Sequence, residues 1–593
     1  MILTAAFAIF ELGCVAAGPA LVNDSAIATE GDSATLLVSG GEEVPEGLCE
    51  VALDCWGDIL DEPKGPCDIS IVSESGVAEY EGPAAVELHG RSSLTFPKPQ
   101  YSVELRSYTE LLVWPGATWA YLDDGSDPGA AWMMPGFDDS AWSIGAAPLG
   151  YGGDWLNTMM NGGSPPEDVR YTTYFRRTFS SASLTDIAEL ELGILRNDAV
   201  AVFLNGTEVL RENLDEDANY RDHAELPVAD DDELRWLSVG VAPGLLVEGP
   251  NVLAVELHQA EADLGTARFD LYFDASGAEA EVDLFGMGAE SDWSLNGMYV
   301  DRALLRNKLA FDVFASFGGA ERYAPESRYC ELTLNGDYRG IYALGERIKR
   351  ASSRLDLAEG GTPGDSFIIK LDDEEGFHEN AVGTGIWQMV YPEADNVSEA
   401  QVEAFLVEWE GAIRGADPTN PESGVFAQLD LSSAVDWVIL QELTKNVDAY
   451  QLSVYLWRDD GGSVYFAPWD FDLSMGYPYY DCGATNWIFR PEFVTVMAAD
   501  PAFRAQMTAR WAELRQGALS DAALARRIAA IDATLAPAID RNFERWPIEE
   551  IVFSTDELDN WLCPVGSYEE EHARVIEFLA QRLAWMDANL VAF

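Results

Sequence analysis

Three aspartates in the last third of the sequence stand where carboxylates could act together. Asp470 and Asp472 interrupt the apolar run VYFAPWDFDLSMGY, and Asp448 lies upstream in KNVDAY. Carboxylates in an apolar setting are costly unless a cation accompanies them. Oxygen ligands with no nearby His suit Mg²⁺, Mn²⁺ or Ca²⁺ better than Zn²⁺. The three aspartates are therefore candidate ligands of a hard metal ion.

The surrounding pattern predicts a hairpin that brings these aspartates close together. A helix ends near Asn446, the strand SVYLWRD follows, and the glycines at 461–462 turn the chain into the strand VYFAPWD. Asp448 then precedes the first strand, and Asp470 ends the second. Because side chains alternate along a strand, the chain must turn at Asp470 for it and Asp472 to bind one ion. The alternative interpretation is that these aspartates cap turns after the strands.

Length and composition limit the fold and the partners. A chain of 593 residues is too long for one core and suggests about two to four units, and its 48% hydrophobic residues suffice to fill them. A formal charge of −66 repels nucleic acid and anionic lipid, so we expect no nucleic-acid partner. The acidic, lysine-poor surface suits salty or calcium-rich surroundings, although a lineage-wide bias in composition explains it equally well.

The N-terminus carries a short apolar segment. MILTAAFAIF is followed by Cys14 among small residues, which is typical of a signal or lipoprotein segment over 1–18 and too short to span a membrane. Glu11 and the absence of a preceding Lys or Arg depart from that pattern. We expect an exported protein, extracellular or associated with the cell surface, with lipidation at Cys14 as one route, and no transmembrane span.

The cysteines favour an oxidising compartment. Cys49, Cys55 and Cys67 cluster without the paired spacing or nearby His of a zinc site. We predict one disulfide within this cluster and a second between Cys482 and Cys563. Buried free thiols are the alternative.

Residues 110–275 are predicted to form an all-β unit. Short alternating strands separated by turn residues are typical of a β-sandwich. The segment resembles galactose-binding-like jelly-roll modules, which implies a carbohydrate ligand and Ca²⁺ as candidates, with most aromatic residues in the core. The motifs that carry the resemblance are Phe137-Asp138-Asp139-Ser140, Tyr174-Phe175-Arg176-Arg177, Ala201 to Gly206 and Asn251 to Glu256.

The remainder of the chain favours an α+β class. A hairpin with an Asn-Gly-Asp turn is predicted around 335–337, and a helix with Ser398 as its N-cap follows. The C-terminal segment, from 501 onward, has mostly helical periodicity. A strand-rich part therefore precedes a helix-rich part.

Several ordered motifs of this α+β part resemble the CotH kinase family, which contains atypical protein kinases. The resemblance covers 69–108 and 280–593, so 110–275 is interpreted as an insertion into a discontinuous domain. The turn-rich, acidic composition of 19–68 predicts a linker or a small strand-bearing extension. The motifs are His89-Gly90-Arg91-Ser92-Ser93, Phe96-Pro97-Lys98, Arg306-Asn307-Lys308, Leu334 to Gly340, Glu346-Arg347-Ile348-Lys349, Asn446-Val447-Asp448 and Trp469-Asp470-Phe471-Asp472.

The resemblance implies phosphoryl transfer from ATP with Mg²⁺ or Mn²⁺. Asp448 takes the catalytic-loop role and Asp470 the role of principal metal ligand, which also makes it catalytic. Asp472 supports Asp470 in binding the metal. Ser453 stands where many relatives have an Asn metal ligand, a departure that indicates a different hold on the metal or reduced activity.

Four further residues are assigned to the nucleotide by the same resemblance. Lys349 or Lys370 contacts the phosphates, Glu346 pairs with the lysine or aids the metal, and Arg306 completes the set.

Two functional hypotheses follow. The first is an exported, metal-dependent protein kinase that phosphorylates Ser or Thr of a secreted or surface protein, with the jelly-roll module for targeting. The second is a non-catalytic surface pseudokinase that binds carbohydrate or a protein through that module. In both cases we expect a monomer.

Overall fold

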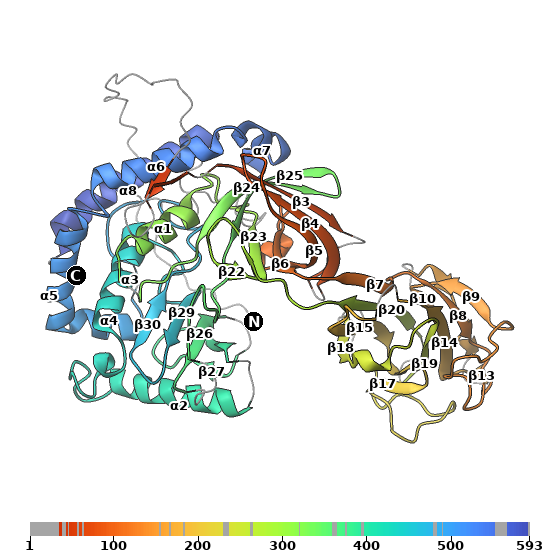
Figure 1. The fold of residues 1–593 in the computed structure, drawn as a ribbon. Coiled ribbons are helices and arrows are strands. Elements are labelled where there is room, and N and C mark those ends of the chain that lie inside the picture. Colours follow the sequence, from red (N-terminus) through yellow and green to blue (C-terminus); the bar gives the residue numbers. More distant parts are fainter. Residues whose placement is uncertain are drawn as a thin grey trace.

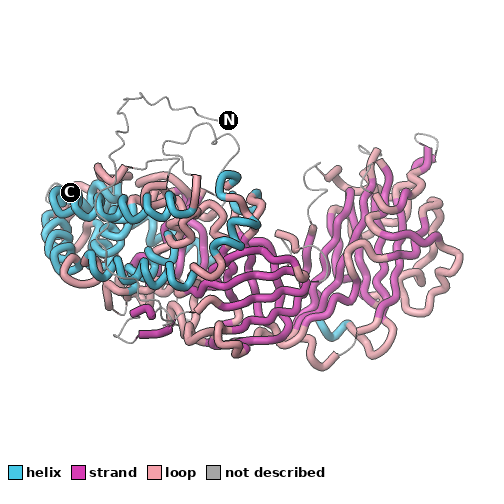
Figure 2. Tube along the Cα trace, turned by 90° about the horizontal axis from the view of Figure 1, so that it is seen from above, coloured by secondary structure: helices cyan, strands magenta, loops and turns pink. Residues whose placement is uncertain are grey.

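The chain folds into three parts arranged in a row. In this computed structural model, Figure 1 and Figure 2 show a strand barrel in the middle, a β-sandwich on one side and a sheet covered by helices on the other. The described residues are 35–37, 43–45, 47–55, 59–61, 64–152, 156–164, 168–181, 184–228, 236–260, 265–319, 321–358, 364–373, 376–392, 396–477, 483–488, 490–551, 566–590 and 593.

The central barrel closes from two distant segments of the chain. Its strand order is β23-β25-β24-β3-β4-β5-β6, and β3 pairs parallel with β24 whereas the other neighbours are antiparallel. Alternate apolar side chains fill the interior, including Val51, Ile69, Val103 and Trp293. The strands are β3 (Cys49–Cys55), β4 (Gly65–Val72), β5 (Ala78–His89), β6 (Gln100–Leu105), β23 (Asp292–Asn296), β24 (Ser327–Leu334) and β25 (Asp337–Gly345).

The barrel corrects the interpretation of 19–68 as a linker or extension. β3 lies within that range and β4 crosses its end, so the predicted boundary at residue 69 cuts a core strand. The segment looked like a linker because its short apolar runs are separated by Gly, Pro and Asp. Long-range pairing of β3 with β24, which the sequence does not reveal, and pairing of β4 with β3 and β5 make them core strands.

Two disulfides join strands of this barrel. Cys55 bonds to Cys67 across β3 and β4, as predicted for the cluster. Cys49 bonds to Cys330 across β3 and β24, which was not predicted. Cys482 and Cys563 lie outside the described residues. Disulfides of this kind are typical of proteins from oxidising compartments.

Residues 109–276 form a β-sandwich between β6 and β23. One sheet has the order β11-β10-β20-β15-β18 with β7 beside β20, and the other has the order β17-β16-β19-β14-β8-β9. Phe175 and Phe269 stack between the sheets with ring centroids 3.8 Å apart, and Trp119 packs edge-on against Phe269. These aromatic residues are core, as predicted. The strands are β7 (Thr109–Val113), β8 (Thr118–Leu122), β9 (Ser143–Ala146), β10 (Leu149–Tyr151), β11 (Thr158–Met159), β14 (Thr172–Phe179), β15 (Glu189–Asn197), β16 (Ala199–Leu204), β17 (Thr207–Glu212), β18 (Leu237–Val241), β19 (Asn251–His258) and β20 (Ala267–Ser276).

The third part packs helices on a five-stranded sheet of order β27-β28-β26-β29-β30. Helix α3 begins at the N-cap Asp430, which accepts the main-chain N–H of Ser433, and is buried along nearly its whole length. The strands of this sheet are β26 (Phe367–Asp372), β27 (His378–Glu379), β28 (Ile386–Tyr391), β29 (Val454–Arg458) and β30 (Val464–Ala467). The helices of this part are α1 (Arg306–Ala315), α2 (Asn396–Ile413), α3 (Leu431–Thr444), α4 (Glu492–Ala499), α5 (Pro501–Leu514), α6 (Asp521–Leu535), α7 (Ile539–Arg545) and α8 (Tyr568–Asn589).

Sequence periodicity identified several elements of the barrel and of the sheet–helix part. The two predicted hairpins are β24–β25 and β29–β30, and the C-terminal segment of the chain is helical over α5 to α8. The predicted N-cap Ser398 is wrong, because α2 starts two residues earlier at Asn396.

The remaining elements are short. They are β1 (Thr35–Leu37), β2 (Glu43–Pro45), β12 (Gly163–Ser164), β13 (Asp168–Val169), β21 (Val282–Asp283), β22 (Ala289–Glu290) and 3₁₀ turns at Ser92–Thr95, Pro243–Leu245, Val425–Ala427 and Ile548–Glu550. Within the described ranges, no helix combines the length and the apolar character needed to cross a membrane.

Candidate functional site

A cavity of about 970 Å³ lies between the barrel and the five-stranded sheet. His89 and Arg91 line it from the end of β5 and the loop that follows, and Glu346 and Arg347 line it from the end of β25. The polar residues on the opposite wall include Lys370, Asp372, Asp373, Asp448, Ser453, Asp470 and Asp472. The cavity therefore collects most of the predicted site residues.

The chain turns at Asp470, which allows Asp470 and Asp472 to line the same cavity. Asp470 has φ +61°, in the left-handed region that a regular strand does not use. Asn446, just after α3, donates from Nδ2 to the main-chain oxygen of Asp470 at 2.8 Å. The main-chain N–H of Phe471 donates to Oδ1 of Asn307, in α1, at 2.6 Å. One asparagine in α1 and another that follows α3 thus fix the turn.

Asp448 reaches the cavity from the loop between α3 and β29. The main-chain N–H groups of Gln451 and Leu452 both donate to the main-chain oxygen of Asp448 at 3.0 Å, which closes a tight turn. Ser453 follows at φ +53° and donates from Oγ to Oδ2 of Asp470 at 3.3 Å. The β29–β30 hairpin therefore holds Asp448 and Ser453 beside Asp470.

Negative charge accumulates at this end of the cavity. Loss of hydration, together with the carboxylates of Asp470 and Asp372, raises the pKa of Asp448 to about 7. Loss of hydration also raises the pKa of Asp470 and raises that of Asp472 well above its ordinary value. Asp470 and Asp472 each act on the pKa of the other, so the two side chains adjoin and a bound cation would stabilise their charged forms.

The residues present fit a hard divalent cation. Over the described parts of the chain, no group of three or more His, Cys, Asp or Glu side chains is arranged to hold a metal unaided. Mg²⁺ commonly uses one or two carboxylates and completes its shell with water and phosphate oxygens. Asp470 and Asp472, with the hydroxyl of Ser453 beside them, are the residues that would hold it. Ca²⁺ in the sandwich stays a prediction.

Basic residues also line the cavity. Lys370 forms an ion pair with Asp372, two residues further along β26 and on the same face of that strand. Arg347 donates to Oγ of Ser102 at 2.9 Å. Loss of hydration, then the charges of Arg347 and Lys370, lowers the pKa of His89 to about 4, so its imidazole is neutral at pH 7. Because Lys370 is a cation that lines the cavity, it is a suitable phosphate ligand.

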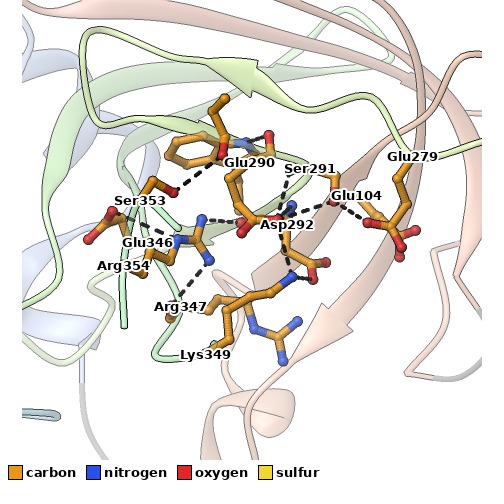
Figure 3. A network of polar contacts seen from close by, with 12 residues as sticks. Glu104, Glu279, Glu290, Ser291, Asp292, Glu346, Arg347, Lys349, Ser353 and Arg354 are labelled. Carbon is orange, nitrogen blue, oxygen red and sulfur yellow. Dashed lines mark hydrogen bonds and ion pairs between the residues drawn. The ribbon is translucent and has the colours of Figure 1, made fainter. Parts of the chain in front are cut away.

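Lys349, by contrast, is not among the residues that line the cavity. Its Nζ donates to Asp292 at 2.6 Å and to Glu290 at 3.1 Å, as Figure 3 shows. These contacts fasten the segment after β25 to β22 and β23. The structure corrects the assignment of Lys349 to the phosphates and leaves Lys370 as the predicted lysine that lines the cavity.

Arg306 also has a structural position rather than a place at the cavity. Its side chain is fully buried and forms ion pairs with Asp301, at 2.6 Å, and with Glu571 of α8. Its Nε donates to the main-chain oxygen of Ser474 at 2.7 Å. Arg306 thus ties α1 to α8 and to the segment after the aspartates, which corrects its assignment to the cofactor.

Glu346 lines the cavity, but its charged partner is Arg354 and not the predicted lysine. Its carboxylate accepts the main-chain N–H of Glu326 at 2.9 Å and lies 3.7 Å from Nε of Arg354. Arg354 also donates to the main-chain oxygen of Arg347 at 3.1 Å (Figure 3). Loss of hydration raises the pKa of Glu346 to about 7. This carboxyl group therefore keeps its proton more readily than an exposed glutamate.

Four residues of the site were missed as functional candidates. Asn307 and Arg347 stood inside motifs already singled out, without a role. Asp372 could have been flagged by its spacing of two from Lys370, which in a strand places both side chains on one face. Asn446 also stood inside such a motif without a role, because its contact with Asp470 depends on the fold.

Comparison with known proteins decides the family. A family model described as CotH kinase protein matches residues 267–586, more than half of the chain. This chain belongs to the CotH kinase family. The CotH match begins in β20 and does not include β3 to β6, so the motifs around His89 lie outside it.

Individual relatives are distant. The chain is 24% identical over 189 residues to inner spore coat protein H of Bacillus subtilis (strain 168), which is 31% of this chain and 49% of that CotH protein. The chain thus spans about half the length of this curated relative.

Solved structures match a smaller share of the chain. A β-glucuronidase of Bacteroides uniformis is 18% identical with a TM-score of 0.21, over 28% of this chain and 18% of that chain. A β-glycosidase of Bacteroides vulgatus is 14% identical with a TM-score of 0.19, over 29% and 20%. Similarities this weak carry no argument about fold or function.

Proposed function

We propose that this CotH family member is an exported, metal-dependent protein kinase that transfers the γ-phosphoryl group of ATP to Ser or Thr of a secreted or surface protein. In this proposal the barrel and the sheet–helix part are the two lobes of a kinase-like fold, and the cavity between them holds the nucleotide.

One observation carries the proposal. Asp448, Asp470 and Asp472 gather at one part of a cavity that Lys370 and Arg347 also line. The interaction of Lys370 with Asp470 shows that the cationic and acidic parts of the cavity adjoin. Phosphoryl transfer needs such an arrangement, because phosphate oxygens require cations and the cations require carboxylates.

Each residue then has a defined task. Asp470 and Asp472 hold Mg²⁺ or Mn²⁺, which when bound neutralises charge on the phosphates. Lys370 and Arg347 bind phosphate oxygens. Asp448, with its pKa near 7, accepts a hydrogen bond from the incoming hydroxyl and takes its proton. Phe311, Met389 and Trp469 supply an apolar wall that excludes water.

Export and targeting complete the proposal. The two disulfides support passage through an oxidising compartment, and the apolar segment over 1–18 supports a signal sequence. The β-sandwich would bind carbohydrate or a surface protein and bring the kinase to its substrate.

Phosphate transfer from labelled ATP tests the proposal. The wild-type chain with Mg²⁺ or Mn²⁺ is expected to label itself or an added acceptor protein, and Asp470→Ala is expected to lose at least about a thousandfold in rate. Asp417→Asn, an exposed aspartate, serves as the control and should keep full activity. Equal labelling by wild type and Asp470→Ala, or by neither, would favour a non-catalytic surface protein.

A further inference from the structure

An ion pair spans the cavity between the barrel and the five-stranded sheet. Arg91 follows β5 in the barrel, Asp373 follows β26 in the sheet, and the two side chains form an ion pair. Both residues also line the cavity. Arg91 therefore has a carboxylate partner at a position from which a ligand in the cavity could compete for it.

This pair is easily exchanged for another partner. The two side chains are 52% and 53% exposed, and ion pairs in such settings contribute about 0–1 kcal/mol. The loop itself is more firmly defined. Gly90 has φ +108°, a Cβ there would collide with Oγ of Ser93, and that Oγ donates to the main-chain oxygen of His89 at 3.1 Å. The backbone thus presents Arg91 at a fixed place while its long side chain can change partners.

Two further cations near Arg91 could share an anionic ligand with it. Arg347 and Lys370 line the same cavity, and both act electrostatically on His89, two residues before Arg91. A polyphosphate carries more charge than a single carboxylate, and its oxygens match the planar fork of a guanidinium. A polyphosphate in this cavity would therefore outcompete Asp373 for Arg91.

We infer that Arg91 is a third phosphate-binding side chain of this site, beside Lys370 and Arg347, and that Asp373 holds it until the terminal phosphates of a nucleotide replace that carboxylate. The inference deepens the proposed function and rests on it for the identity of the nucleotide. The inference concerns only how the polyphosphate chain is bound, whereas the proposed function also includes the transfer of the phosphoryl group. In the bound form, Arg91 joins the barrel to the ligand instead of to the sheet.

Binding measurements on the full chain test this inference. We would titrate ATP, AMP and inorganic tripolyphosphate, each with Mg²⁺, by calorimetry. Arg91→Gln is expected to weaken ATP and tripolyphosphate about tenfold and AMP less than twofold. Asp373→Asn, which releases Arg91, is expected to tighten ATP and tripolyphosphate about threefold and leave AMP unchanged. Arg91→Lys, which keeps the charge without the fork, should fall between wild type and Arg91→Gln.

A matched control distinguishes the effect of losing Arg91 from the effect of losing any surface arginine. Arg339→Gln removes an arginine that also pairs with an exposed aspartate, Asp337, but does not line the cavity, and it should bind like wild type. Equal ATP affinity in Arg91→Gln and wild type would overturn the inference, as would an equal loss of ATP and AMP.

The outcomes also separate this inference from the kinase proposal. A chain that binds tripolyphosphate through Arg91 but transfers no phosphoryl group supports the inference and contradicts the kinase proposal. A chain that transfers phosphate with no contribution from Arg91 supports the kinase proposal and contradicts the inference about Arg91. A chain that binds no polyphosphate contradicts both.

Discussion

Asn446 donates a hydrogen bond from its side chain to the main-chain oxygen of Asp470, across 2.8 Å. The donor follows helix α3 and the acceptor follows strand β30, so this one bond connects the two elements that carry the acidic cluster. Asn446 is 2% exposed and Asp470 has a positive φ. The bond therefore holds Asp470 in a conformation that few non-glycine residues adopt.

Replacing Asn446 by Ala is expected to destabilise the chain and to disturb the site. The main-chain oxygen of Asp470 loses its donor in a half-buried place, which costs about 1–3 kcal/mol. The free energy of unfolding in urea and the Mg²⁺ concentration for half-maximal ATP binding would report the two effects. Asn589→Ala removes a similar bond, to the main-chain oxygen of Trp585, and should leave Mg²⁺ dependence unchanged. A wild-type Mg²⁺ response in Asn446→Ala would contradict the positioning role.

The two candidate lysines are expected to behave differently. Lys370→Met should weaken ATP at least about tenfold through loss of a charge-assisted hydrogen bond. Lys349→Met removes the ion pairs with Glu290 and Asp292 and should lower the melting temperature with little effect on ATP affinity. Calorimetric titration beside thermal unfolding distinguishes them. The reverse pattern would restore Lys349 as the phosphate ligand.

Ser453→Asn is expected to strengthen metal dependence. Asn tolerates the left-handed conformation observed at Ser453, with φ +53°, better than Ser does. Its amide oxygen is also a stronger metal ligand than a hydroxyl, so the Mg²⁺ concentration for half-maximal phosphoryl transfer should fall about threefold. Ser453→Ala should raise that concentration. If the Asn and Ala variants shift it equally, this position does not contact the metal.

The two disulfides are expected to contribute unequally to stability. In the chain-entropy model, the bond between Cys49 and Cys330, 281 residues apart, contributes about 5 kcal/mol, and the bond between Cys55 and Cys67, 12 residues apart, about 3 kcal/mol. Paired Cys→Ser variants compared by urea unfolding would measure the difference. A larger loss from the Cys55–Cys67 pair would show that loop length does not govern their contributions.

Asp270 is expected to make the β-sandwich less stable as the pH rises. Its side chain is buried, and loss of hydration raises its pKa from an ordinary value of 3.8 to about 6, despite hydrogen bonds from the main-chain N–H groups of Gly116 and Leu271. The native state thus binds a proton more tightly than the unfolded state, so stability falls between about pH 4 and pH 6 by up to about 3 kcal/mol.

Asp270→Asn should flatten this dependence. The free energy of unfolding, monitored through the sandwich tryptophans at pH 4, 5, 6 and 7, should change less between pH 4 and pH 7 in Asp270→Asn than in the wild type. A variant with the same slope as wild type would mean that another group causes the pH effect.

Local pattern predicted local structure well in this chain. The Asn-Gly-Asp turn, the glycine turn at 461–462 and the helical period of the C-terminal segment each depend on neighbours in sequence, and all three are present. Asp448, Asp470 and Asp472 were found in the same way, because charged residues in an apolar run are conspicuous. The resemblance to the CotH family then supplied roles that spacing alone could not.

The errors share a physical cause. Lys349 and Arg306 were assigned from motifs, yet each pairs with carboxylates brought from elsewhere by the fold, Glu290 and Asp292 for the first and Glu571 for the second. The place of β3 in the core was missed for the same reason, since its pairing partner β24 lies far along the chain. Long-range pairing of charges and strands leaves no local signature in one sequence.

The parallel pairing of β3 with β24 sets an order of assembly. During synthesis β3 to β6 emerge first, but their barrel cannot close until β23 to β25 follow the whole sandwich out of the ribosome. The sandwich has all of its strands beforehand and can complete itself, while β3 and β6 keep open edges that invite wrong partners. The barrel is thus completed after the sandwich, although its first strands are made earlier. Until β23 to β25 arrive, the edges of β3 and β6 must stay unpaired.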